Sequence, residues 1–359
     1  MKFFKKAVLS MMILGMMTFV SAPQGYAAWP DAPITVVIQY AAGGGTDMLT
    51  RLYAKLMEKP LGATINAVNR EGAIGAMAMD FVNSKPSDGY WWMGASQYSK
   101  PLRVMGHTKL NPWKDWQYYN CATGIQAWAV KPDSPFKTFA DFLDAARKNP
   151  GKFSLSHSGV GGIWHEGNEL LMSATKINFR QIPYKGGAPA TLAALQGEVD
   201  VAGSGLHEQI EFIRAGKLRS LAVFTNEPIR LKDGTVLRPV TNFVPGLGKF
   251  APFGSEYTLG IKRETPADIL EKVKQAFIVA VNSPEFEDFL EKRFFFKDLK
   301  LGEDADKMAA LRESVTAWLF WNSKIEGAKI NPADIGIPKP EEFDAWWPSK
   351  DYKPRIRSK

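Results

Sequence analysis

The stretch ITVVIQYAAGGGTDMLTRLYAKLM, residues 34–57, decides the fold prediction. Its first six residues are mostly apolar and β-branched, which predicts a buried strand. Residues 48–57 carry apolar side chains at helical spacing, so a helix is expected there. The glycines between these segments predict a tight turn. A strand, a glycine-rich turn and a helix in this order form the repeating unit of an α/β sheet.

The same unit recurs in two series along the chain. Strands at 64–68 and 90–94 flank a helix at 75–83, which predicts a parallel sheet with helices on both faces. The pattern restarts near Ile125, and from Thr265 the chain becomes helical. We therefore expect two doubly wound α/β domains, with the late helices packing back onto the first. The second series is expected to consist of the helix 139–148 and the strands 127–130, 153–156, 179–182, 199–202 and 218–224.

The two series predict how the chain is divided. Residues 28–126 and 226–328 are expected to form domain 1, which is interrupted in sequence, and residues 127–225 are expected to form domain 2. The final segment, 329–359, is rich in proline, tryptophan and charge and has no helical period. We expect this tail to wrap over the surface of a domain.

The first 27 residues have the pattern of a secretory signal peptide. Lys2, Lys5 and Lys6 are followed by an uncharged apolar run at 7–20 and by the small residues of Gly25-Tyr26-Ala27 before the expected cut. The apolar run is shorter than the roughly 20 residues that a stable membrane span needs. The mature protein is therefore expected to be exported to the periplasm in soluble form.

The single cysteine, Cys121, and the charge balance exclude several further classes of protein. Cys121 lies far from the expected cleavage site, so neither a lipid anchor nor an intrachain disulfide is expected. The net charge of +8 falls to +5 once the three lysines of the leader are removed. Because no run of five like charges occurs, we expect no nucleic-acid partner. We also expect a monomer, whose stability comes from two cores of ordinary size.

Three glycine-rich stretches that follow predicted strands are candidate anion sites, at residues 42–47, 156–162 and 203–205. Glycines allow backbone N–H groups to approach an anion, and a helix N-terminus adds unpaired N–H groups. Ligands of open α/β sheets bind outside the carboxyl ends of the strands, so two facing domains would bring these stretches to one cleft. A tight turn without a ligand is the alternative for each stretch. The candidate ligand-binding residues are Gly43, Gly44, Gly45, Thr46, Asp47, Ser96, Ser158, Gly159, Gly161, Gly162, Trp164, Ser204 and Gly205.

The sequence offers little for catalysis or for a metal ion. The four histidines lack zinc-ligand spacing, and Ser158 does not lie in the Gly-x-Ser-x-Gly elbow of hydrolases. We therefore expect no catalytic residue, metal or cofactor. The alternative from another class is an extracytoplasmic hydrolase or lyase that acts on a carboxylate through His157, His165 and Ser158.

Several motifs resemble those of the tripartite tricarboxylate transporter receptor family, also called the TctC or Bug family. The matches run in order from Trp29 to Pro266 and are WPDAPI at 29–34, GGGTD at 43–47, NREGA at 69–73, PSDGY at 86–90, NPGK at 149–152, SGVG at 158–161, PYKGG at 183–187 and GKLRSLAV at 216–223.

The resemblance implies a type II periplasmic binding protein fold, with a ligand cleft between its two domains. It implies that residues 43–47 and 158–162 clasp a di- or tricarboxylate or an aromatic carboxylate, with Ser204 and Gly205 near the other end of the ligand. Family members deliver such ligands to a pair of membrane carrier subunits. A receptor that feeds a sensor kinase is equally compatible with export and a cleft.

Three features depart from the family pattern. Ala41 and Ala42 replace the usual prolines, residues 240–244 lack the expected Pro-Thr-x-x-Glu stretch, and the tail is longer than usual. Trp164 follows the second glycine-rich stretch, and either core packing or contact with a flat ligand would explain it. Contact would favour an aromatic or flat apolar ligand over a compact acid such as citrate.

Overall fold

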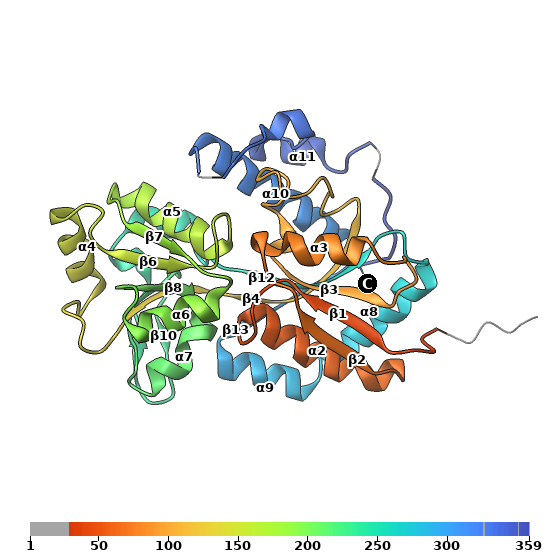
Figure 1. Ribbon diagram of the computed structural model, residues 1–359, viewed down its shortest axis with the longest axis horizontal. Coiled ribbons are helices and arrows are strands. Elements are labelled where there is room, and N and C mark those ends of the chain that lie inside the picture. The colour runs from red at the N-terminus through yellow and green to blue at the C-terminus, as the bar shows by residue number, and fades with distance from the viewer. Residues whose placement is uncertain (1–28, 326, 351, 359) are drawn as a thin grey trace, which may run out of the picture.

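The computed structural model describes residues 29–325, 327–350 and 352–358, so the expected signal peptide, 1–27, lies outside the described residues. The chain forms two lobes joined by extended segments (Figure 1). Lobe 1 contains a six-stranded sheet in the order β13-β4-β12-β3-β1-β2. Its strands are β1 (Ile34–Ile38), β2 (Ile65–Asn69), β3 (Trp91–Ser96), β4 (Trp116–Gly124), β12 (Glu256–Lys262) and β13 (Phe295–Lys300). Its helices are α2 (Gly45–Leu61), α3 (Ala76–Asn83), α8 (Ala267–Val281), α9 (Pro284–Arg293) and α10 (Gly302–Asn322).

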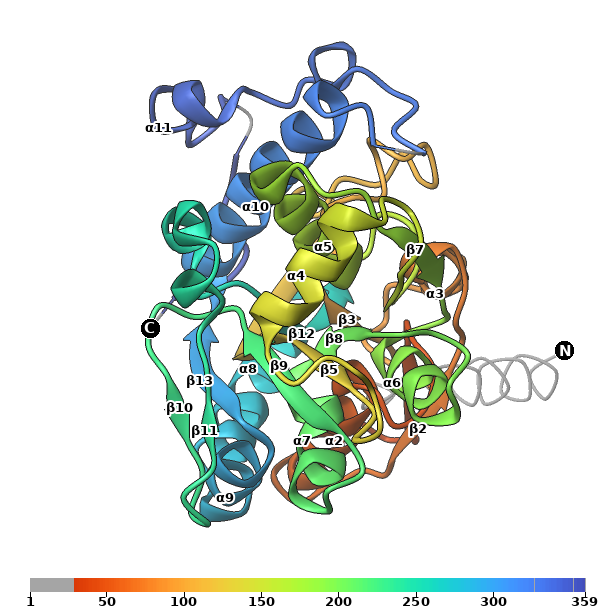
Figure 2. The same cartoon turned by 90° about the vertical axis from the view of Figure 1, so that its left-hand side faces the viewer.

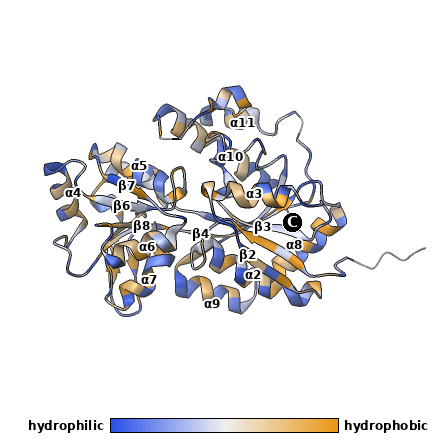
Figure 3. Ribbon diagram, viewed as in Figure 1, coloured by the Kyte–Doolittle hydropathy of each residue, from blue (hydrophilic) through white to orange (hydrophobic). Residues whose placement is uncertain are grey.

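Side-chain alternation along β1 gives lobe 1 a separate core on each face of its sheet. Ile34 and Val36 pack against α2, α8 and α9, whereas Val37 points to the opposite core with α3 and α10. This is the period of two that a strand imposes. Figure 3 shows the hydrophobic colour concentrated in these inner strands, while the colours alternate along surface helices such as α9.

Lobe 2 has a three-stranded sheet in the order β8-β5-β9 and a parallel pair of β6 and β7. A bridge between Leu155 and Val201 joins the two sheets. Four helices cover them (Figure 2). Apolar side chains of α4, α5 and α7 form one core around Trp128, whereas α6 packs in a smaller cluster with Val199 and Ala202. The strands are β5 (Gln126–Val130), β6 (Ser154–His157), β7 (Arg180–Pro183), β8 (Ala202–Gly205) and β9 (Arg219–Val223), and a hairpin of β10 (Ile229–Arg230) and β11 (Val236–Leu237) follows. The helices are α4 (Phe139–Lys148), α5 (Ile163–Thr175), α6 (Gly187–Gln196) and α7 (Leu206–Arg214).

Two crossing segments connect the lobes by antiparallel hydrogen bonds. The Gly124 N–H donates to the Ser255 carbonyl over 2.8 Å, and the Ser255 N–H donates back to Gly124 over 3.1 Å. Next to this pair, the Gln126 N–H donates to the Phe253 carbonyl over 3.0 Å. A Cβ on Gly254 would lie 1.6 Å from the Gly124 carbonyl oxygen, so only glycine allows this close approach.

The α/β class is confirmed, and three expectations about individual elements need correction. The parallel pairing of β1 with β2 and β3 agrees with the prediction, but β12, β4 and β13 add antiparallel strands that the sequence did not indicate. Residues 203–205 belong to strand β8 and are not a loop. Helix α2 runs past its expected end at residue 57 and includes Pro60 in its last turn, and Gly62 in left-handed conformation ends it.

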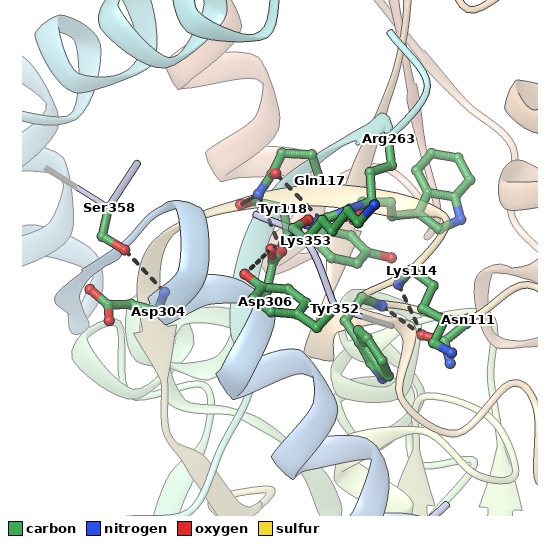
Figure 4. A network of polar contacts seen from close by, with 12 residues as sticks. Asn111, Lys114, Gln117, Tyr118, Arg263, Asp304, Asp306, Tyr352, Lys353 and Ser358 are labelled. Carbon is green, nitrogen blue, oxygen red and sulfur yellow. Dashed lines mark hydrogen bonds and ion pairs between the residues drawn. The ribbon is translucent and has the colours of Figure 1, made fainter. Parts of the chain in front are cut away.

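The C-terminal segment is not wholly irregular, since it contains the short helices η5 (Pro332–Ile335), η6 (Pro340–Glu342) and α11 (Phe343–Trp346). The rings of Trp346 and Trp347 both contact Trp113 of lobe 1, with centroids 5.6 and 5.4 Å apart. Polar bonds fasten the segment as well, since the Tyr352 hydroxyl donates to buried Asp306 over 2.9 Å (Figure 4). Among the described residues, no helix is long and apolar enough to cross a membrane.

Candidate functional site

The N-termini of four helices meet where the two lobes face each other. Each of these helices, α2, α5, α6 and α7, has a glycine at the N-cap and therefore no side chain there to accept from its first N–H groups. The N-cap residues are Gly44, Gly162, Gly186 and Gly205. A convergence of helix N-termini, whose first N–H groups have no acceptor within their own helices and whose dipole ends are positive, favours an anion.

The first turns of these helices line a cleft that is nearly closed. Its volume is about 20 Å³, which is room for about one water molecule. Two buried side-chain atoms in its wall, Ser158 Oγ and Gln97 Oε1, have no hydrogen-bond partner. The lining residues are Tyr40, Gly44, Gly45, Thr46, Ser96, Gln97, Ser158, Ile163, Trp164, Gly187, Glu208, Ser255 and Tyr257.

The structure brings six of the candidate residues into this cleft, namely Gly44, Gly45, Thr46, Ser96, Ser158 and Trp164. Gly159 lines an adjoining cavity of about 260 Å³ that shares Tyr40 and Ser158 with the cleft. Gly43, Gly161, Gly162 and Gly205 support the same turns from outside the lining.

Asp47 and Ser204 are engaged in bonds within their own lobes. The Asp47 carboxylate accepts from the Gly43 N–H over 3.0 Å and from Arg51 Nε over 2.8 Å. The fully buried Ser204 hydroxyl lies 2.7 Å from the Thr191 hydroxyl and accepts from Gln209 Nε2 over 2.8 Å. Both side chains therefore stabilise the turns without lining the cleft.

The sequence prediction missed seven residues of the lining, and Glu208 is the one among them that is an acid; the others are Tyr40, Gln97, Ile163, Gly187, Ser255 and Tyr257. The carboxylate accepts from the Gly205 N–H of its own helix over 2.8 Å and from the Gly45 N–H of lobe 1 over 3.3 Å. Burial raises the pKa of Glu208 to about 7, although hydrogen bonds from Gly205, Gly45 and Trp164 act to lower it. The spacing of Glu208 three residues after Gly205 is the capping-box spacing, which was the one available sequence signal.

His207 fills the contact between the lobes beside Glu208. Its ring is fully buried, its Nε2 lies 3.0 Å from the Tyr257 hydroxyl, and it stacks on Phe295 at a centroid distance of 4.3 Å. Burial, helped by nearby Arg293, lowers the pKa of His207 to about 3, so the ring is neutral at pH 7. His207 thus packs as an uncharged imidazole ring at the base of the cleft.

A larger cavity of about 670 Å³ lies on the other side of β12, and it shares Ile163 with the cleft. Alternation along β12 explains the separation, because Ser255 and Tyr257 face the cleft while Glu256 faces the larger cavity. Four of its charged side chains form ion pairs, with Lys100 Nζ 3.1 Å from Glu166 and Arg312 Nε 2.6 Å from Glu256. No group of three or more acidic, histidine or cysteine side chains that could hold a metal ion occurs among the described residues.

Residues 49–315 match the family described as the tripartite tricarboxylate transporter family receptor. The chain belongs to this family. It is 30% identical over 269 residues to the UPF0065 protein in the gbd 5′ region of Cupriavidus necator, which covers 74% of this chain and 79% of that protein. A solved periplasmic transporter superposes with a TM-score of 0.76 at 28% identity, over 84% of this chain and 100% of that one. Rpa4515 of R. palustris, solved with adipate, gives a TM-score of 0.71 at 25% identity, over 84% of this chain and 98% of that one.

TctC family members are periplasmic substrate-binding receptors and not enzymes, and this assigns the chain to a class of function. The fold agrees, because two α/β lobes enclosing a cleft characterise these receptors. The buried imidazoles are compatible with this class. Burial lowers the pKa of His157 to about 4 and that of His165 to about 3, so both are neutral at physiological pH.

Proposed function

We propose that this TctC-type receptor captures a small carboxylate between its lobes and delivers it to the membrane carrier subunits of a tripartite tricarboxylate-type transporter. The observation that carries the proposal is the convergence of four glycine-capped helix N-termini on one cleft. Main-chain N–H groups of residues 43–47 and 158–162 would hold one carboxylate, and the unpartnered Ser158 hydroxyl would donate to it.

The cleft has to open for the ligand to enter, because about 20 Å³ cannot hold a dicarboxylate. We propose that the two lobes move as two bodies about the crossing segments at residues 124–126 and 253–255. Residues 226–252, which the sequence assigned to domain 1, would then move with lobe 2, because their apolar side chains pack in its core. The expected monomer, exported to the periplasm with removal of residues 1–27, is part of the same proposal. N-terminal sequencing of the exported chain tests the cut before Ala28.

A ligand screen tests the capture of a carboxylate. The panel contains malate, citrate, adipate and aromatic carboxylates, since Rpa4515 was solved with adipate. A ligand at one hundred times its Kd should stabilise the chain by about 2.7 kcal/mol, which thermal shift detects. Calorimetry then gives the Kd, and analysis of the solution for products separates a receptor from a hydrolase or lyase.

Gly44→Val should nearly abolish binding, because a Cβ there already lies 3.3 Å from Glu208 Oε1 and a branched side chain would cover the N–H groups. The matched control is Gly246→Val, at a site with no atom within 4 Å of the added Cβ. Normal melting with unchanged affinity in Gly44→Val would contradict the role of the turn, and the lack of any carboxylate ligand would contradict the proposed function.

A further inference from the structure

The position proposed for the ligand carboxylate is already partly used by a carboxylate of the chain itself. Glu208 reaches from α7 of lobe 2 across the cleft to the Gly45 N–H, the first N–H group of α2 in lobe 1. A Cβ on Gly187, at the start of α6, would lie 1.8 Å from Glu208 Oε2. The side chain therefore sits among the first turns of three of the four converging helices.

Glu208 is the single acidic or basic side chain among the residues that line the described cleft. No lysine or arginine is present there to balance a second negative charge, and only the helix N-termini, at about half a unit charge each, supply positive potential. Together the four helix N-termini offset about two negative charges, which are those of ionised Glu208 and of one ligand carboxylate. A second ligand carboxylate would bring a third negative charge into the buried site, which forces one of the carboxyl groups to take a proton.

We propose that Glu208 determines the ligand class, so that the cleft takes a monocarboxylate whose other polar group is a hydrogen-bond donor facing Glu208. An amide N–H or a hydroxyl satisfies this requirement, whereas a second ionised carboxylate does not. The inference rests on the proposed function, because it assumes that one carboxylate binds at the helix N-termini. Glu208 here acts by direct contact with the donor group of the ligand.

The competing explanation is that Glu208 only caps its own helix. The bond from the Gly205 N–H to Oε2 has the geometry of half a capping box. A cap would not, however, need the second oxygen to approach the N–H group of Gly45 in the other lobe. If Glu208 had a capping role alone, its substitution would lower stability but leave the ligand preference and the pH dependence of binding unchanged.

The charge state of Glu208 makes the inference measurable by pH. With the pKa near 7, about ten in eleven of these side chains are protonated at pH 6 and about one in eleven at pH 8. A dicarboxylate that binds only the protonated form should therefore bind about tenfold more weakly at pH 8 than at pH 6. A monoamide should change little.

The other titratable groups facing Glu208 do not change charge in this interval. Burial keeps the pKa of His207 near 3, and it raises the pKa of Tyr257 well above its ordinary value. Burial also raises the pKa of Tyr40, at the end of β1, to about 12. The lining residues from α2, α5 and α6 carry no titratable side chain. A pH dependence between 6 and 8 that is removed by changing Glu208 is therefore due to Glu208.

The experiment uses succinate, glutarate and adipate with their three monoamides, titrated by calorimetry into the mature chain at pH 6 and pH 8. At pH 8 the wild type should bind the best monoamide at least about tenfold more tightly than the matching dicarboxylate. Glu208→Gln should reduce this preference to within about threefold and remove the pH dependence of dicarboxylate binding. Glu211→Gln, an exposed acid one turn later on α7 that pairs with Arg214, is the control and should behave as the wild type.

Each outcome decides one of the two claims. A dicarboxylate that binds the wild type at pH 8 as tightly as its monoamide overturns the role of Glu208, as does the failure of every monoamide when another carboxylate binds. If no carboxylate of any kind binds, the proposed function fails instead. Should Glu208→Gln not fold, the pH series on the wild type alone still decides, because equal dicarboxylate affinity at pH 6 and pH 8 contradicts the inference.

Discussion

Gly45→Ala adds one methyl group where the two lobes meet. A Cβ at this position would lie 2.4 Å from His207 Nε2 and 2.4 Å from the Tyr257 hydroxyl oxygen. Both partners are buried, and the 3.0 Å contact between them fixes their positions. Neither can move aside without breaking this contact, so the closed arrangement of the lobes has to give way.

The expected cost follows from these distances. Inserting a methylene into a well-packed region typically costs about 1–3 kcal/mol. His207 belongs to lobe 2, so its share of that cost applies to the closed form, which is the form that encloses a ligand. If most of the cost falls on closure, the Kd should rise by about 5- to 150-fold, since 1.4 kcal/mol corresponds to a factor of ten.

The control is the neighbouring residue. A Cβ on Gly44 would lie 3.3 Å from Glu208 Oε1, the end of a flexible side chain, and the φ of −80° suits alanine. Gly44→Ala should therefore keep the Kd within about threefold of the wild type. Calorimetry with the tightest carboxylate of the screen makes the comparison. Equal affinities of Gly45→Ala and the wild type would refute the view that this contact limits closure.

Three further predictions concern the hinge, a buried acid and the tryptophan of the cleft. Gly254→Ala should lower Tm and impair binding, because its Cβ would lie 1.6 Å from a backbone oxygen, whereas Gly246→Ala should do neither; normal melting of Gly254→Ala would contradict the crossing geometry. Burial raises the pKa of Glu313 from 4.5 to about 7, so between these pH values the folded chain keeps a proton that the unfolded chain loses. The free energy of unfolding should therefore fall as pH rises from about 5 to 7, and Glu313→Gln should flatten this slope in denaturant titrations. Trp164→Ala should weaken a flat aromatic carboxylate by about tenfold and an aliphatic one by less, and equal losses in calorimetry would remove the basis for an aromatic preference.

The sequence predicted the elements whose pattern is local. Helix α4 matches its prediction from Phe139 to Lys148, because a threonine N-cap and a regular apolar face mark it. Strands β1, β2 and β3 were found within one or two residues, since β-branched and aromatic residues follow glycine or proline signals. These local signals sufficed for the class of fold.

Strands β4 and β12 escaped prediction because their polar residues are buried by partners distant in sequence. Glu256, the first residue of β12, is buried and forms an ion pair with Arg312 Nε, 2.6 Å away and some fifty residues later. In β4, the fully buried Asn120 donates from Nδ2 to the Asp298 carboxylate over 3.0 Å. Hydropathy alternation cannot indicate a strand whose polar side chains are neutralised in this way.

The sequence predicted those parts of the candidate site that are built from local backbone turns. It missed the parts that depend on side chains brought together from separate segments of the chain. Glycine-rich turns after strands are visible in sequence, and Gly44, Gly45 and Ser158 do line the cleft. Glu208 and Tyr257 are brought to it by the arrangement of the lobes, which a local pattern does not contain. Their positions depend on how α7 and β12 face each other.

The glycines of the site serve the closed arrangement of the lobes as well as a ligand. A Cβ on Gly45, Gly124 or Gly205 would lie 2.4, 2.8 or 2.1 Å from the nearest atom of the His207 ring. All three positions therefore have to be glycine to leave space for this uncharged imidazole ring. A glycine substitution therefore changes ligand contact and interlobe packing together, whereas Glu208→Gln changes charge while keeping nearly the same shape. With main-chain N–H groups available to any carboxylate, the few side chains in the wall have to supply the discrimination. Glu208 is the one among the described lining residues whose charge can distinguish one polar group of a ligand from another.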